Sequence, residues 1–405
     1  MTLCSTVRDP FTHLPLELSS EIFTHCIPPY GADYARPSYP LLLLNICSLW
    51  TRIALATPKL WANLYLRIPA PMMITLDFIQ HLTRWLAHSQ SFPLLLFLCP
   101  KENKAKQGPH PEIIQLIAAH AHHLRELRLR CCSYLVVFSG SPSSPPLHFP
   151  ILKALVAKHL RRDQKVILTS DEFVDILLGA PSLSILNVHM ISIISSSPSD
   201  EQGSVVHAAL TSLAIREDIY RSDSDSPSHN NILSLLTLPS LTRFSVQINR
   251  TDDIACLTSF LQRSSPPLKK LELTSAYHNM AYDSTYHWNP NAIERCFTLL
   301  PELTALEMCG PLTAMQDVLI SLLVGNESMF LPHLAKFKIV RVFREEVGWF
   351  VGVASMLQRR AERMKHFSVL WSGHGLGPVS TPLDAQSEVF RVLEGRGMRI
   401  ELNLG

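Results

Sequence analysis

Residues 41–61 read LLLLNICSLWTRIALATPKLW, and this stretch decides how the N-terminal part of the chain folds. Its apolar side chains recur at three- and four-residue spacing, as they do on one face of a helix. They are Leu43, Ile46, Cys47, Trp50, Ile53 and Ala54. Thr57 and Pro58 then restart the chain, because Thr favours the N-cap and Pro is tolerated at the first helical position. The pattern predicts one helix that runs into a second, short one.

An earlier helix opens in the same way at Leu14-Pro15, with Leu14, Leu18 and Ile22 at four-residue spacing. Three helices in about fifty residues are too few to bury all of this apolar surface by themselves. A partner or the rest of the chain must cover the excess, so the stretch reads as a docking module. The alternative is that Trp50, Trp61 and residues 41–44 only pack the helices together and against the following segment.

Residues 12–66 resemble the F-box of fungal, especially mushroom-type, F-box proteins. The matching features are Leu14-Pro15 with Glu17, Ile22-Phe23, Ile46-Cys47 with Trp50, Ile53-Ala54, and residues 57–61. The resemblance implies that residues 12–61 bind the adaptor of an SCF-type cullin–RING ubiquitin ligase. The residues it implies at or just behind that contact are Leu14, Pro15, Glu17, Ile22, Ile46, Cys47 and Trp50. Residues 26–40 depart from the family as a longer insertion rich in Pro and Tyr, which puts the partner-facing surface in doubt.

After the module we expect a helix over 72–88 and a buried strand over 92–99. A phrase, Leu-x-x-Leu-x-Leu, then recurs about every 30 residues, which is typical of a stacked repeat. Its first positions are Leu124, Leu152, Leu183, Leu210, Leu241, Leu268, Leu303, Leu334 and Met364. The alternation predicts strands, and the helix-like segments 111–123, 171–178, 254–262, 292–299 and 351–363 stand before several of them. One strand–helix unit cannot bury its own apolar face, but stacked neighbours can.

The array resembles a leucine-rich-repeat solenoid, although the Asn or Cys that usually closes the consensus is mostly missing. The expected fold class is therefore α/β: a tail over 1–11, an F-box-like three-helix module over 12–66, and a leucine-rich-repeat-like solenoid over 67–405. The solenoid would end in a helix over 384–394 and a strand over 398–404. Insertions follow predicted strands at 140–146, 195–204, 221–231, 276–291 and 372–381. These loops could form a rim that binds a target protein, or they could simply be tolerated, because lengthening a loop costs little.

Composition and motifs argue against several other classes of protein. The chain has 36 basic and 34 acidic residues, a balance that does not favour nucleic acid or a membrane as partner. Nine scattered cysteines without C-x-x-C spacing indicate reduced thiols in the cytoplasm or nucleus. We find no motif for a catalytic site, a cofactor or a metal. His120, His122 and His123 cluster, but zinc would need further ligands. His120 falls on the apolar face with Ile113, Leu116 and Ile117, so a core histidine is the favoured interpretation there.

The resulting hypothesis is a non-catalytic substrate receptor of a ubiquitin ligase, in the ubiquitin-like conjugation pathway. It would hold an unidentified target near the ubiquitin-transferring enzyme. Two rivals stay open: a scaffold protein that keeps an F-box-like fold outside any ligase, and an enzyme whose groups converge from the loops. Residues 222–226, with alternating Ser and Asp, could be a phosphorylated loop or a plain polar insert.

Overall fold

The structure is a computed structural model of mixed α/β class. It describes residues 10–26, 39–69, 74–100, 110–130, 135, 147–158, 166–189, 191–194, 204–216, 231–248, 251–275, 289–310, 313–325, 330–341, 347–371 and 387–404. The chain forms two compact units. Unit 1 holds Met1–Gln164 and Gly179–Leu183, and unit 2 holds Lys165–Leu178 and Ser184–Gly405.

Unit 1 begins with short helices: η1 (Pro10–Thr12), α1 (Leu16–His25), α2 (Tyr39–Leu43), α3 (Ser48–Leu55) and α4 (Pro58–Trp61). They enclose a small core made of Phe23, Leu43, Ile53, Ala54, Leu60 and Trp61. Phe11 and Trp50 close one side of this core, because the Trp50 ring lies 4.8 Å from that of Phe11 and 4.9 Å from that of Phe23. The core is small because only four short helices contribute to it.

The single helix predicted from Leu41 onward is two helices, and that prediction was wrong. The turn between α2 and α3 covers 44–47, where the main-chain N–H of Asn45 donates to the Leu42 carbonyl. Cys47 is extended, with φ of −159°. The Thr51 hydroxyl then bridges the break by bonding the carbonyls of Leu44 and Cys47, each at 3.0 Å. The break turns Ile46 away from the face that Leu43 and Ile53 share.

The rest of unit 1 alternates strands with helices. The strands are β1 (Asn63–Ile68), β2 (Leu94–Pro100), β3 (Leu124–Leu129) and β4 (Ala154–Lys158), which pair in parallel in that order. The helices are α5 (Leu76–His88), α6 (Pro111–Ala119) and η3 (Ala121–His123). β1 runs across residue 66, the expected end of the module, and its strand character was not predicted. Trp61 joins the helices to this part, because its ring lies 5.0 Å from that of Trp85 and its carbonyl accepts from the Trp85 indole.

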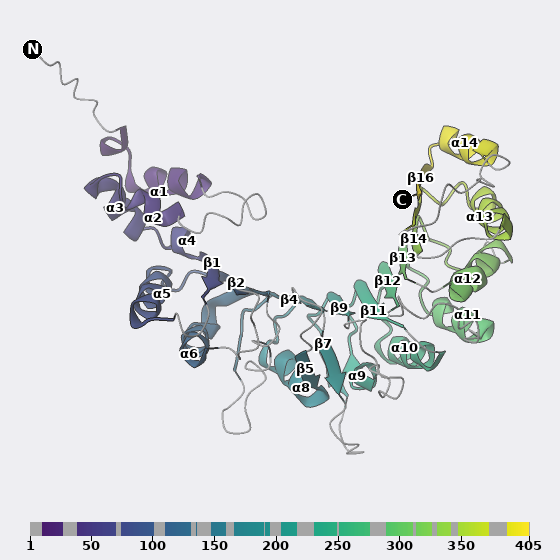
Figure 1. Cartoon of the computed structure of the whole chain (residues 1–405), viewed down its shortest axis with the longest axis horizontal. Helices are drawn as coiled ribbons and strands as arrows, with labels where there is room; N and C mark the ends of the chain where they lie inside the picture. Colours follow the sequence, from purple (N-terminus) through teal and green to yellow (C-terminus); the bar gives the residue numbers. More distant parts are fainter. Residues whose placement is uncertain are drawn as a thin grey trace, which may run out of the picture. The chain divides into compact units, whose positions relative to one another are not determined.

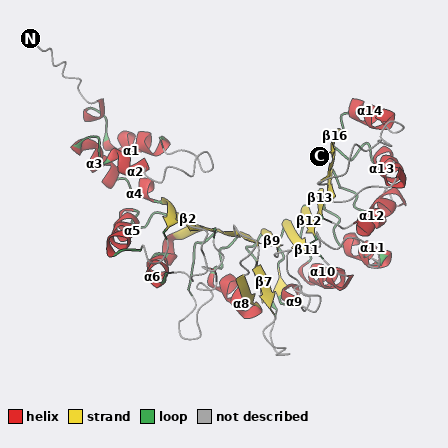
Figure 2. Cartoon of the chain, in the orientation of Figure 1, coloured by secondary structure: helices red, strands yellow, loops and turns green. Residues whose placement is uncertain are grey.

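Unit 2 is a longer series of the same kind (Figures 1 and 2). Its main sheet pairs in parallel in the order β6 (Ile185–His189), β9 (Ser212–Arg216), β11 (Arg243–Gln247), β12 (Lys270–Thr274), β13 (Ala305–Cys309), β14 (Lys336–Arg341), β15 (His366–Trp371) and β16 (Arg399–Leu404). The helices are α8 (Ser170–Gly179), α9 (Asn231–Ser234), α10 (Thr251–Ser264), α11 (Pro290–Thr298), α12 (Thr313–Gly325), α13 (Val347–Arg359) and α14 (Ser387–Gly395). Figure 1 shows α10 to α14 on one side of the strands β11 to β16.

The recurring apolar phrase is confirmed as the buried side of these strands. Its positions are all buried in both units, including Ala157 at 0% exposure, the position where the phrase lacks a large side chain. The register keeps equivalent positions adjacent, so that Leu271 pairs with Leu306, Leu306 with Phe337 and so on. The predicted helices match α6, α8, α10, α11, α13 and α14 to within a few residues. One strand–helix unit thus buries its apolar face against the next.

Some elements were not predicted. Helix α12 was missed, and so were two small parallel pairs, β5 (Val166–Thr169) with β7 (Ile191–Ile194) and β8 (Val205–Val206) with β10 (Leu236–Thr237). The insertion after the first helix and the five long insertions of the array lie almost entirely outside the described residues. Among the helices that are described, none combines the length and the apolar character needed to cross a membrane.

Candidate functional site

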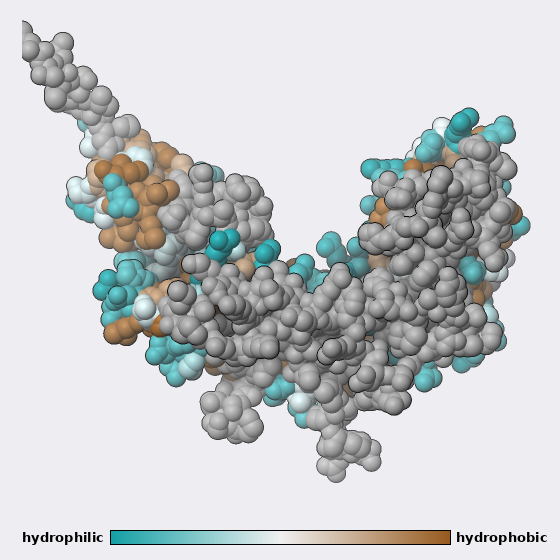
Figure 3. Space-filling view, viewed as in Figure 1, coloured by the Kyte–Doolittle hydropathy of each residue, from teal (hydrophilic) through white to brown (hydrophobic). Residues whose placement is uncertain are grey.

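Large apolar side chains gather on the outside of the N-terminal helices, where Figure 3 shows a hydrophobic area. We call this set the outer apolar surface. Its members are Leu14, Leu16, Leu18, Ile22, Leu41, Leu42 and Ile46, exposed by 36 to 55%. Exposed leucines are ordinary when they occur singly, but a gathered set of them marks an interaction surface.

Helix α1 carries its apolar stripe toward solvent. Leu18 is 55% exposed and Ile22 is 41% exposed, whereas Ser19 and Phe23 on the opposite side are 1% exposed. Phe23 decides this orientation, because its ring packs against Phe11 at 5.1 Å and against Trp50. A serine occupies the inward side while leucines face water, which reverses the usual arrangement of an amphipathic surface helix.

The residues implied at the adaptor contact divide into two groups. Leu14, Pro15, Glu17, Ile22, Ile46 and Cys47 are exposed, the first four at or near α1 and the last two in the turn before α3. Trp50 is half-buried between Phe11 and Phe23, so it supports the surface from behind. Leu60 and Trp61 are buried in the core at 1% and 2% exposure. Leu16, Leu18, Leu41 and Leu42 belong to the exposed set as well, although the sequence interpretation did not name them as contacts.

Thr57 holds α1 and α3 together, although not as the N-cap that the sequence predicted. Its hydroxyl lies 2.7 Å from the Ile53 carbonyl and 2.8 Å from Ser20 Oγ, and it makes no cap bond to α4. Pro58 does stand at the first turn of α4, as expected. Lys59 reaches Glu21 at 3.4 Å across the same junction, but both side chains are about half exposed, so the pair contributes little. Thr57 therefore fixes the helix bearing the apolar stripe.

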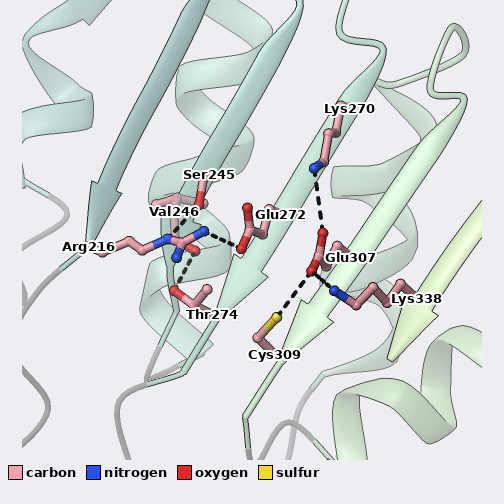
Figure 4. A network of polar contacts seen from close by, with 9 residues as sticks. All are labelled: Arg216, Ser245, Val246, Lys270, Glu272, Thr274, Glu307, Cys309 and Lys338. Carbon is pink, nitrogen blue, oxygen red and sulfur yellow. Dashed lines mark hydrogen bonds and ion pairs between the residues drawn. The ribbon is translucent and has the colours of Figure 1, made fainter. Parts of the chain in front are cut away.

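A second candidate site is a polar network on the strand face of unit 2 (Figure 4). Arg216 on β9 pairs with Glu272 on β12 and donates to Ser245 Oγ at 3.3 Å. Glu307 on β13 accepts from Lys338 at 2.6 Å and lies 3.5 Å from Lys270. These side chains point away from the buried phrase, so they stand on the face opposite the helices.

The network neutralises its own carboxylates. Burial alone would raise the pKa of Glu307, but the hydrogen bond and charge of Lys338, with Lys270, hold that pKa below its usual range. Burial, together with Glu307 and Glu272, raises the pKa of the Cys309 thiol to about 12. One ligand atom each from Glu272, Glu307 and Cys309 lies within 4.8 Å of the others, the spacing of a metal site. Because Arg216, Lys270 and Lys338 already balance the two carboxylates and the thiol keeps its proton, we assign the cluster a structural role.

The histidine cluster is packed rather than arranged around an ion. His123 is buried at 4% exposure, with its ring 4.4 Å from that of His122 and 5.1 Å from that of His120. Burial, and then the neighbouring rings, lowers the pKa of His123 to about 4. It is therefore His123, not His120, that is the buried member of the cluster. The serine–aspartate segment at 222–226 lies outside the described residues.

Two arginines bind main-chain carbonyls, which the sequence did not lead us to predict. Arg360 is 2% exposed and donates to the carbonyls of Leu323, Phe330 and Leu331. Arg263, near the end of α10, donates in the same way to the carbonyls of Leu233 and Leu236. Both arginines stand at the end of a helix, Arg263 five residues before Leu268 and Arg360 four residues before Met364. This recurring position in the repeat could have indicated their shared role.

Neither a model of a known protein family nor a curated protein sequence matches this chain.

Proposed function

We propose that this protein is a non-catalytic substrate receptor of an SCF-type cullin–RING ubiquitin ligase. In this proposal the helices of residues 12–61 are an F-box-like module that binds the ligase adaptor. The strand–helix units form a leucine-rich-repeat-like solenoid whose rim loops bind a target protein. The receptor would act by proximity: it raises the effective concentration of the target near the ubiquitin-transferring enzyme and does no chemistry itself.

The observation that carries the proposal is the orientation of α1. Leu18 and Ile22 face solvent while Ser19 faces the core, so the chain keeps an apolar stripe uncovered. A helix or helical groove of a partner is the usual occupant of side chains at this spacing. The resemblance of residues 12–66 to fungal F-boxes selects the ligase adaptor as that partner. The proposal needs no cofactor, metal ion, nucleic acid or membrane.

The proposed location is the cytoplasm or nucleus. What supports it is the use of cysteine: no disulfide joins the cysteines that the structure describes, and two of them, Cys99 and Cys296, are buried as free thiols.

The test is binding of the purified chain to the ligase adaptor, with Leu18→Asp/Ile22→Asp as the variant. Each side chain is about half exposed, so covering the remainder would contribute about 1 kcal/mol per residue. Loss of both contacts, with two carboxylates placed in an apolar interface, should weaken binding by roughly thirtyfold or more. The fold should survive, because neither side chain belongs to the core.

The matched control is Leu178→Asp/Val392→Asp, at 59% and 50% exposure on α8 and α14. This control should bind the adaptor as wild type does, and circular dichroism should show both variants folded. If wild type fails to bind the adaptor at micromolar concentrations, the receptor proposal is wrong, and the scaffold alternative takes its place. Equal loss of binding in both variants would show that α1 is not the contact.

A further inference from the structure

Basic side chains line up where the strands of unit 2 begin. The register places Arg243 beside Lys270, Lys270 beside Ala305, Ala305 beside Lys336, Lys336 beside His366 and His366 beside Arg399. From Arg243 to His366 each of these residues lies between two buried positions of the recurring phrase, and Arg399 follows the buried Met398, so their side chains stand on the face opposite the helices. Lys269 and Lys365 stand one residue before β12 and β15 begin. We call the residues Arg243, Lys269, Lys270, Lys336, Lys365 and Arg399 the basic row; all are exposed.

The main chain holds this row in a fixed order. Successive amides at the start of each strand bond one carbonyl of the previous strand: Lys269 and Lys270 donate to Thr242, and Ala335 and Lys336 donate to Thr304. The same arrangement, two successive amides that donate to one carbonyl, recurs from β9 to β15. At several strands a threonine hydroxyl donates to the same carbonyl. The spacing of the cations therefore follows from the sheet and does not depend on mobile loops.

Part of the row forms no ion pair with the residues that the structure describes. The carboxylates that lie two residues further along the strands already form ion pairs. Glu272 pairs with Arg216, Glu307 with Lys338 and Lys270, and Glu401 with Arg399 and His366. In the part of the chain that the structure describes, Arg243, Lys269, Lys336 and Lys365 make no ion pair. Two exposed acids, Glu302 and Glu362, stand in the turns before β13 and β15, and among the described residues neither forms an ion pair with the row.

We infer that the basic row binds an acidic, extended segment of a partner protein. Strands lie about 4.8 Å apart, so the row spans roughly 24 Å from β11 to β16. An extended peptide of about seven residues covers that distance. Such a peptide lies across the strands, and the flexible lysine side chains reach its carboxylates.

The row suits an acidic peptide better than a nucleic acid. The cations form a single line of roughly 24 Å, which matches one extended chain and not the two phosphate backbones of a duplex. Exposed aromatic side chains that stack on single-stranded bases do not occur on the described strand residues of the row. This edge of the sheet is also opposite the one from which the long insertions leave, so the inference concerns a separate surface. It does not rest on adaptor binding.

The test measures fluorescence anisotropy of a labelled peptide of eight glutamates with the full chain at low salt. The variant Lys269→Glu/Lys336→Glu/Lys365→Glu reverses three cations of the row. The control Arg84→Glu/Arg295→Glu/Arg391→Glu makes the same change in formal charge at exposed sites on α5, α11 and α14. We expect saturable binding by wild type, at least tenfold weaker binding by the row variant, and a change below twofold in the control.

Three outcomes would overturn the inference: no binding by wild type, equal weakening in both variants, or tighter binding of an eight-nucleotide thymidine strand through the same lysines. Circular dichroism melting checks that the variants fold. If the row variant unfolds, Lys269→Gln/Lys336→Gln/Lys365→Gln replaces it, with weakening of at least threefold expected. Adaptor binding by the row variant should equal that of wild type, so failure here is distinguishable from failure of the receptor proposal.

Discussion

Replacing Arg360 should destabilise unit 2 more than replacing Arg263, although both arginines bind main-chain carbonyls. Arg360 is 2% exposed, and its guanidinium donates to Leu323 at 3.1 Å, Leu331 at 3.0 Å and Phe330 at 2.6 Å. Arg360→Met keeps the volume of the side chain and removes every donor. Three carbonyls then lose a charged partner, and Leu323 lies in the last turn of α12, where a cation also suits the helix dipole.

The magnitude follows from burial. A hydrogen bond to a charged donor contributes about 1.5–3 kcal/mol, but burying the guanidinium offsets part of the sum, so we expect a net loss of about 3–5 kcal/mol. Arg263 contacts two carbonyls and is exposed, which reduces the expected loss for Arg263→Met to about 1–2 kcal/mol. The loss of stability for Arg360→Lys should lie between these two values, because lysine keeps the positive charge but lacks the planar guanidinium that bonds several carbonyls at once.

Urea unfolding followed by circular dichroism gives the midpoints, and hydrogen exchange locates the change. Exchange should rise first at amides of α12 and of the turn before β14. Because a chain of stacked units need not unfold in one step, the midpoints are compared together with exchange at named amides. The reasoning fails if Arg360→Met unfolds within 1 kcal/mol of wild type, or if both arginine variants lose the same stability.

Three further predictions concern unit 1 and the thiols. With a folded pKa of about 4 against about 6.5 unfolded, His123 takes up its proton first in the unfolded chain. The contribution of His123 to stability is therefore intact above pH 6.5, and it falls by up to roughly 3 kcal/mol as the pH drops to 4. Urea unfolding at several pH values should show this loss. The dependence of stability on pH should be flatter in His123→Phe. Cys47 is exposed and should be alkylated by iodoacetamide at neutral pH, and bound adaptor should protect it. Cys309, with a thiol pKa of about 12, should stay unmodified. Mass spectrometry measures the modification of both thiols. Trp61→Phe removes a buried indole bond to the Ala54 carbonyl at 2.8 Å and should cost about 1–2 kcal/mol in thermal unfolding.

The array could be predicted from the sequence because burial there repeats. One phrase, read about every 30 residues, located the strands and the side chains that face the helices. The same alignment carried a second signal: Glu272, Glu307 and Lys338 all stand four residues after the start of the phrase. Opposite charges at one repeat position on adjacent strands indicate cross-strand ion pairs, and the polar network could have been found this way.

The module was less predictable because its helices are short and carry two competing stripes. One stripe holds Leu18 and Ile22 of α1 together with Leu14 just before it, and the other holds Ser19 and Phe23. Spacing alone cannot say which stripe faces inward. The aromatic cluster of Phe11, Phe23 and Trp50 decides, and it joins residues far apart in sequence, which no local pattern encodes. The break at 44–47 has the same cause: helix periodicity continues through it, whereas packing of α2 and α3 on one core requires a turn.

The two candidate surfaces differ in chemistry, and the difference bears on how each partner is held. The outer apolar surface gains from burial, which salt does not screen, and interfaces of that kind are typical of lasting complexes. The basic row acts through exposed charges, which lose most of their effect beyond the Debye length of about 8 Å at physiological salt. A partner on the basic row should therefore exchange quickly and be released by salt that leaves the partner of α1 in place. A salt titration of the two complexes would measure this difference.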